Sequence, residues 1–166
     1  CAQRGLQVLL LDDDDTVSVG SRGLCYAKRT LEVLDRLGCG QALVDKGVVW
    51  LAINSTATDA SDYLAPPKMA AWMQEHKASA NATLMDADGK IGRAYGARTT
   101  PHMYVIDKQG VLAYAGAIDS KPTSRVDDIK TATNHVNAAL AEVLAGKAVS
   151  VAATQPYGCS VKYSSM

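Results

Sequence analysis

The sequence lacks an excess of charge, a long hydrophobic run and a paired-cysteine motif, and each absence excludes a class of protein. Lys and Arg number 17 among the 166 residues, as do Asp and Glu. The net charge is therefore zero, and nothing favours binding to nucleic acid or to an anionic membrane. No apolar run approaches the roughly 20 residues of a membrane-spanning helix, and no signal-peptide pattern follows Cys1.

Reactive side chains are also sparse. The four cysteines are widely spaced, at Cys1, Cys25, Cys39 and Cys159. Without a Cys-x-x-Cys pair, the chain has neither a zinc ribbon nor a dithiol thioredoxin motif. No histidine lies at metal-ligand spacing from another, and neither a Ser/His/Asp arrangement nor a phosphate loop is visible, so no metal is expected. A reducing cytosol is the compartment we expect.

The chain does have enough apolar residues for one core, since 48% are hydrophobic and 20% charged, and its length suits one domain. The continuous apolar run 6–11 predicts a parallel strand covered on both faces. The run 48–54 predicts a central strand, and 83–85 a short one. Helical spacing and helix-end residues predict further elements. These are helices at about 24–37, 67–76 and 127–144, with a helical turn at 91–96.

Pro101 directly precedes another apolar run, 102–107. Because proline cannot donate a ladder hydrogen bond, it belongs at the first residue of a strand or on an edge. A cis peptide bond would be tolerated after Thr100. A glycine-containing turn and a second run, 111–115, complete a predicted β-hairpin. His102 and Arg98 flank the proline, and a lone histidine beside a strand is typically structural.

From about residue 48 to 163 the chain resembles a thioredoxin-like redoxin domain of the AhpC/TSA type, in the thioredoxin/peroxiredoxin superfamily. The helical turn before Pro101 and the ending Gly-Cys-Ser-Val-Lys-Tyr at 158–163 carry the resemblance. It implies a cis-proline loop, at Thr100 and Pro101, that faces a reactive cysteine. That part of the chain lacks the family's first strand and the helix that bears its redox cysteine.

Residues 4–47 resemble a second family, the FAD-dependent aromatic-ring monooxygenases. A strand with an acidic tip is followed by Arg22 and Arg29. The resemblance implies that Asp12 holds the FAD ribose and that both arginines lie near the cofactor. The Gly-x-Gly-x-x-Gly turn that cradles the pyrophosphate is absent, so we do not expect this fragment to hold FAD alone. The alternative for the acidic cluster is a solvated strand end.

Together the two parts predict one α/β domain, residues 1–166, with a thioredoxin-like fold. Its central mixed sheet is flanked by helices. The flavoprotein-like segment 1–47 supplies the first βα unit, residues 48–145 form the redoxin-like core, and 146–166 form a tail. We interpret the chain as a chimera of the two families.

Cys25 then lies near the start of the first helix, where the helix dipole and Lys28 or Arg29 would lower its pKa. It has no second thiol three residues on, so exchange would use Cys159, Cys39 or an external thiol. The alternatives are that Cys25 is a small buried apolar residue and that Cys159, in a loop-like tail, is an unreactive surface thiol.

Three functions follow. The first is a thiol-disulfide or peroxide oxidoreductase without a cofactor, whose catalytic residues are Cys25, Cys159, Thr100 and Pro101. Its partners would be a thiol, disulfide or peroxide substrate and a protein redox partner, with no nucleic acid and no membrane. The second is a redox-inactive thioredoxin-like binding module. The third is a fragment of an FAD-dependent aromatic hydroxylase.

Overall fold

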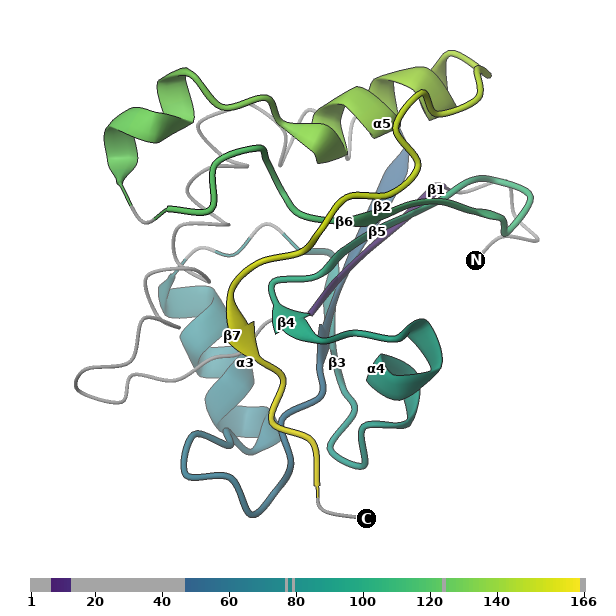
Figure 1. Cartoon of the computed structure of the whole chain (residues 1–166). Helices are drawn as coiled ribbons and strands as arrows, with labels where there is room; N and C mark the ends of the chain where they lie inside the picture. Colours follow the sequence, from purple (N-terminus) through teal and green to yellow (C-terminus); the bar gives the residue numbers. More distant parts are fainter. Residues whose placement is uncertain (1–6, 13–46, 77, 79, 124, 165–166) are drawn as a thin grey trace.

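A five-stranded mixed sheet forms the centre of the protein (Figure 1). The computed structural model describes residues 7–12, 47–76, 78, 80–123 and 125–164. Strand order in the sheet is β3-β2-β1-β5-β6. The strands are β1 (Gln7–Asp12), β2 (Val48–Asn54), β3 (Ala82–Met85), β5 (Met103–Ile106) and β6 (Leu112–Gly116). Parallel pairing joins β1 to β2 and β2 to β3, and antiparallel pairing joins β1 to β5 and β5 to β6.

β1 is the middle strand of this sheet, between β2 and β5. The predicted strands 6–11 and 48–54 are confirmed, with β1 shifted by one residue. β1 is not purely parallel, because its second neighbour, β5, runs antiparallel. The helix expected at about 24–37 lies outside the described residues. The first segment of the chain therefore supplies a strand that the sheet needs at its centre.

Helices α3 (Pro66–Glu75), α4 (Lys90–Tyr95) and α5 (His135–Leu144) flank the sheet, with a 3-10 helix, η2 (Val126–Lys130). The expected single helix over 127–144 is wrong, because η2 ends before α5 begins. Asn134 has an extended backbone, and its side chain accepts a hydrogen bond from the Asn137 N–H at 2.7 Å. An asparagine in this position caps a new helix rather than continuing an old one.

Side chains alternate along β2, β5 and β6, so each of these three strands contributes residues to two cores. Val48 and Trp50 of β2 belong to the larger core, beneath α5. Ile53 of β2 and Tyr104 of β5 belong to a smaller core on the opposite face. The remaining buried members of the larger core are Met103, Val105, Tyr114, Ile118, Val136, Ala139 and Leu140. The smaller core lies against the segment that precedes Pro101, since Ala97 is part of it.

The predicted hairpin of β5 and β6 is confirmed. Its turn is held by Asp107, whose Oδ1 accepts hydrogen bonds from the N–H groups of Gln109 and Val111, both at 2.9 Å. Gly110 follows in the left-handed region, with φ 85°. An aspartate that bonds backbone groups two and four residues ahead is common turn chemistry.

The C-terminal tail runs along β6 and then across the sheet's end, as the yellow trace in Figure 1 shows. Ala115 of β6 exchanges backbone hydrogen bonds with Ala152 and Thr154 at 3.0 and 3.1 Å. Further on, β7 (Cys159–Ser160) pairs antiparallel with β4 (Thr99–Thr100). The expectation of a loop around Cys159 is therefore wrong: the cysteine lies in a short strand.

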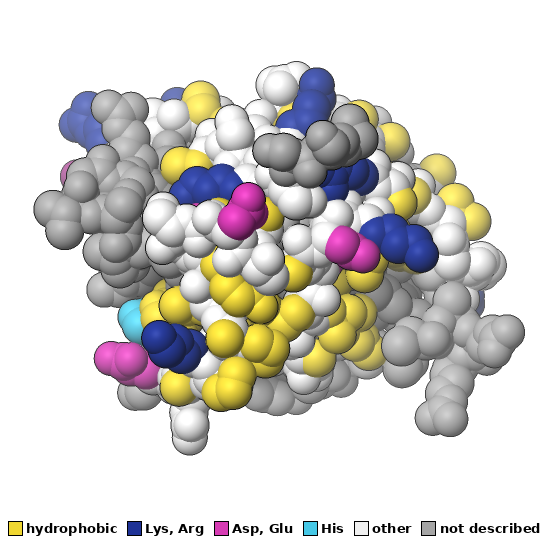
Figure 2. All heavy atoms as spheres, turned by 90° about the horizontal axis from the view of Figure 1, so that it is seen from below, with side chains coloured by type: hydrophobic (Ala, Val, Ile, Leu, Met, Phe, Trp, Pro, Cys, Tyr) yellow, Lys and Arg dark blue, Asp and Glu magenta, His cyan; other side chains and the backbone are white. Residues whose placement is uncertain are grey.

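In the described part of the chain, no helix is long and apolar enough to cross a membrane. Hydrophobic side chains do gather on the face drawn in Figure 2. Among the exposed large hydrophobic residues of the protein are Leu84 of β3 and Ile91 and Tyr95 of α4, each between 37% and 39% exposed. Partial exposure of large hydrophobic side chains is ordinary for a protein surface.

Candidate functional site

The loop between β4 and β5 contains the cis peptide bond Thr100-Pro101. Thr100 is only 1% exposed, and its hydroxyl has no hydrogen-bond partner among the described residues. The Thr99 hydroxyl donates to the Pro101 carbonyl at 3.1 Å. Pro101 lies just before β5 rather than at its first residue, a position that suits a residue without an N–H. The short strand before this loop, β4, faces the C-terminal tail.

Cys159 lies directly opposite Thr100 in the β4–β7 pair, and Ser160 lies opposite Thr99. Opposed residues of antiparallel strands have their Cβ atoms about 5 Å apart. The cysteine is half-buried. Gly158 makes this approach possible, because a Cβ atom there would lie 2.0 Å from the Thr100 carbonyl oxygen. The fold thus brings together Thr100, Pro101 and Cys159, three of the four residues predicted to be catalytic.

Residues 157–164, which we call the strap, are held by hydrogen bonds on both sides of Cys159, to the segment after β6 and to the segment before Pro101. Before it, the Tyr157 hydroxyl donates to Asp119 at 2.6 Å. After it, the Val161 N–H donates to the Arg98 carbonyl at 3.2 Å, and the Tyr163 hydroxyl donates to the Ala97 carbonyl at 2.8 Å. The strap is therefore an integral part of the site.

An ion pair adds to this anchoring. Lys162 contacts the carboxylate of Asp62, which is only 4% exposed. The Lys162 carbonyl also accepts a hydrogen bond from the Ala57 N–H at 2.9 Å. A buried carboxylate is costly without a partner, so this contact holds the strap against the loop that follows β2. No pattern in the sequence indicated that Asp62 and Lys162 would meet.

His102 is buried beneath the proline loop. It stacks on Tyr104 with ring centroids 4.5 Å apart, and the Arg98 N–H donates to its Nδ1 at 3.4 Å. Burial, and then the positive charge of Arg98, lower the pKa of His102 to about 4. The imidazole is therefore neutral at pH 7 and supplies no positive charge to a neighbouring thiolate.

Acidification is expected to destabilise the protein through His102. Its pKa is about 6.5 when unfolded and about 4 when folded, so the unfolded chain binds more protons between these values. Stability is then complete above about pH 6.5 and falls as the pH drops toward 4, by about 2 kcal/mol between pH 7 and pH 5. Urea unfolding across this pH range should show the decrease in the free energy of unfolding. His102→Gln should remove the part of this pH dependence that comes from the histidine. An identical slope in the variant would contradict the assignment.

Asp86 fixes the start of α4, which leads into the proline loop. Its carboxylate accepts hydrogen bonds from the Ser55 hydroxyl at 2.7 Å and from the N–H groups of Ile91 and Gly92 at 2.9 and 2.8 Å. Burial alone would raise the pKa of Asp86, but these hydrogen bonds hold it below its usual value. A carboxylate at a helix N-terminus in this arrangement is structural.

The other predicted residues are not brought to this site by the described structure. Cys25, Arg22 and Arg29 lie outside the described residues, as do Cys1 and Cys39. Asp12 is the last residue of β1, with its backbone in register with Ile53. What sequence reasoning missed was the pairing of β4 with β7. Its one available signal was Gly158, immediately before the cysteine.

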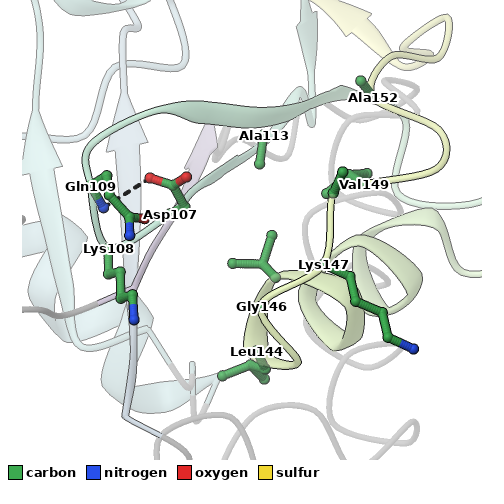
Figure 3. A pocket seen from close by; sticks show the side chains of 11 residues that line it. Asp107, Lys108, Gln109, Ala113, Leu144, Gly146, Lys147, Val149 and Ala152 are labelled. Carbon is green, nitrogen blue, oxygen red and sulfur yellow. Dashed lines mark hydrogen bonds between the residues drawn. The ribbon is translucent and has the colours of Figure 1, made fainter.

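A separate hollow of about 480 Å³ lies between the β5–β6 turn and the segment after α5 (Figure 3). Asp107, Lys108 and Gln109 line it from the turn, and Val149 and Ala152 from the tail. Figure 3 shows the hydrogen bond between Gln109 and Asp107 that closes the turn. The described residues that line this hollow include no cysteine, no histidine and no residue of the proline loop.

The sheet order and the proline loop define a thioredoxin-like protein, and solved structures share this fold. A hypothetical protein from Sinorhizobium meliloti 1021 aligns with TM-score 0.74 and 22% identity over 99% of this chain and 84% of its own. An uncharacterized conserved protein from Geobacillus kaustophilus aligns with TM-score 0.75 and 22% identity, over 98% of this chain and 79% of its own. A thioredoxin-like protein in the oxidized form aligns with TM-score 0.52 and 18% identity, over 86% of this chain and 80% of its own.

The model of the AhpC/TSA family matches residues 28–115, and this chain belongs to that family. No curated protein matches the chain. The predicted thioredoxin-like fold and redoxin family are thus confirmed. The family match begins inside segment 4–47, and β1 lies at the centre of the redoxin sheet. The monooxygenase resemblance and the chimera stay predictions.

Proposed function

We propose that this protein is a thiol-disulfide oxidoreductase in which Cys25 and Cys159 are the exchanging thiols. The observation that carries the proposal is the register of β7, which sets Cys159 opposite Thr100 and beside Pro101. Membership in the AhpC/TSA family and the likeness to an oxidized thioredoxin-like protein support it. No Cys-x-x-Cys pair is needed, because the second thiol comes from the tail.

The exchange proceeds in two displacements. The Cys25 thiolate attacks one sulfur of a substrate disulfide, forming a mixed disulfide and releasing one substrate thiolate. The Cys159 thiolate then attacks the Cys25 sulfur, releasing the second substrate thiol and leaving a Cys25–Cys159 disulfide. An external dithiol reductant restores both thiols and is itself oxidised. Two electrons pass from the protein to the substrate and are replaced by the reductant.

Thiolate formation must be favoured by groups other than His102, which is neutral at pH 7. At Cys25, the start of the predicted helix and the charges of Lys28 and Arg29 would do this. A lowered pKa at that position would raise the thiolate fraction at neutral pH, which is the nucleophilic form. Cys159 needs only to reach the mixed disulfide, where proximity replaces a low pKa.

The pH dependence of alkylation at each cysteine, read by mass spectrometry on the reduced protein, tests this function. We expect Cys25 to titrate clearly below the ordinary thiol value of about 8.5. We expect Cys25→Ser to abolish disulfide turnover and Cys159→Ser to trap the mixed disulfide and lower turnover at least about 100-fold.

Cys39→Ser is the control and should keep wild-type turnover. If all cysteines of the folded protein titrate normally and Cys25→Ser is as active as the wild type, the protein is instead a redox-inactive thioredoxin-like module. Peroxide consumption measured with the same variants separates peroxide reduction from disulfide exchange. A yellow purified protein would support the FAD-dependent alternative, whereas we expect a colourless one.

A further inference from the structure

The backbone edge of the proline loop is occupied by the protein's own tail. An unpaired strand edge is a template on which an extended peptide can add as another strand. β4 is a short strand next to the cis-proline, but its backbone is already paired with Cys159 and Ser160 of β7. A polypeptide that sought to pair with β4 would first have to displace the strap.

Displacement would break contacts that flank Cys159 on both sides. Tyr157 is bonded to Asp119 on one side, and Lys162 and Tyr163 are bonded to Asp62 and to the Ala97 carbonyl on the other. Displacing the strap would separate Lys162 from Asp62, whose carboxylate is only 4% exposed while the strap is in place. The ion pair and the tyrosine hydrogen bonds would all be lost, so the closed arrangement is the stable one.

There is also no space for a second chain between the strap and β4. At Gly158 even a single added carbon would lie 2.0 Å from the Thr100 carbonyl oxygen and 2.7 Å from its carbonyl carbon. These are backbone atoms, so they cannot turn aside as a flexible side chain could. A peptide cannot therefore slip beneath the strap while β7 remains paired.

From this geometry we propose that the strap excludes extended polypeptides and restricts the protein to low-molecular-weight disulfides. The inference rests on the proposed thiol-disulfide exchange and names the substrate class for the same site. A small disulfide needs only to bring one of its sulfur atoms to the attacking thiolate, and it does not have to pair with the β4 backbone. The strap thus supplies the second thiol and determines specificity at the same time.

The test compares single-turnover oxidation of the fully reduced protein by glutathione disulfide and by the disulfides of insulin, at equal disulfide concentration and fixed pH. No recycling reductant is present, so only the first exchange is measured. We expect the wild type to react at least about tenfold faster with glutathione disulfide. Lys162→Gln should raise the ratio of the insulin rate to the glutathione disulfide rate at least about fivefold.

Tyr163→Phe, which removes the hydrogen bond to the Ala97 carbonyl, is the milder second variant and should shift the ratio in the same direction. Lys130→Gln is the matched control, because Lys130 forms an exposed ion pair with Asp127 far along the sequence from the strap. It should leave both rates unchanged. Hydrogen exchange at the Val161 amide, which is bonded to Arg98, reports independently whether the strap has opened.

A wild type that reacts faster with insulin would overturn the proposal. An unchanged ratio in variants whose Val161 amide exchanges faster would overturn it as well, because an open strap would then not alter access. If neither disulfide oxidises the wild type and no cysteine shows a low pKa, the proposed exchange function itself is wrong. The two failures are therefore distinguishable.

Discussion

Replacing Gly116 by alanine is expected to destabilise the protein by about 3 kcal/mol. Gly116 ends β6 with φ 153°, where side chains are rarely accommodated. A Cβ atom there would lie 2.3 Å from the Thr154 hydroxyl, 2.6 Å from its carbonyl oxygen and 2.8 Å from its nitrogen. The variant therefore combines backbone strain with a clash against the tail.

Thr154 cannot move away from the added carbon at low cost. Its N–H donates to the Ala115 carbonyl at 3.1 Å. Its hydroxyl accepts a hydrogen bond from the Ala117 N–H at 2.9 Å and lies 2.6 Å from the Tyr114 hydroxyl. Any shift of Thr154 breaks these bonds, and Tyr114 is fully buried. The tail should therefore detach from β6 in this variant.

Gly146→Ala is the matched control for Gly116→Ala. Gly146 follows α5 with φ 69°, yet no atom of the described residues lies within 4 Å of a Cβ atom placed there. Only backbone strain is added, so we expect a loss of about 1 kcal/mol. Urea unfolding followed by circular dichroism gives both values. Equal losses in the two variants would show that Thr154 is not held against β6.

The elements that the sequence predicted well are those specified by neighbouring residues. The strand 48–54 follows from an unbroken run of strand-forming residues, and the hairpin follows from two apolar runs with Gly110 in the turn between them. Pro101 indicated where a strand begins, because it lacks an N–H. Each signal acts within a few residues and needs no knowledge of the tertiary structure.

The β4–β7 pair could not be predicted in the same way. Its partners are far apart in the chain, as the bond between Tyr163 and the Ala97 carbonyl, across 66 residues, illustrates. A two-residue strand such as Cys159–Ser160 has too few residues to show period-two alternation. Asp62 and Lys162 likewise look like ordinary surface charges in the sequence. Only the fold reveals that Asp62 is buried against the strap.

The split between η2 and α5 shows a further limit of prediction from the sequence. Apolar residues at helical spacing predicted one helix across 127–144, since periodicity alone does not register a local cap. Asn134 interrupts it, because its side chain bonds the backbone of Asn137 and its own backbone forms a bridge with Asp119. Asparagine competes with the helix for backbone hydrogen bonds. A cap inside a periodic segment must therefore be weighed against the apolar pattern.

The larger core gives the second major prediction. Trp50→Ala is expected to cost about 4 kcal/mol, since truncating a large buried aromatic side chain leaves a cavity. Trp50 is 1% exposed and packs with Tyr114 and Leu140 between β2 and α5. Its backbone is also held, because the Trp50 N–H donates to the Asn81 side chain at 2.7 Å. The backbone therefore cannot readily shift to fill the cavity.

Trp72→Ala is the control, because Trp72 is the chain's second tryptophan. Trp72 is half-buried on α3 and stacks on His76 with ring centroids 4.0 Å apart. Removing it should cost only about 1 kcal/mol. Each variant keeps one tryptophan, so fluorescence and circular dichroism can follow urea unfolding of both. A loss for Trp72→Ala as large as that for Trp50→Ala would contradict a core centred beneath α5.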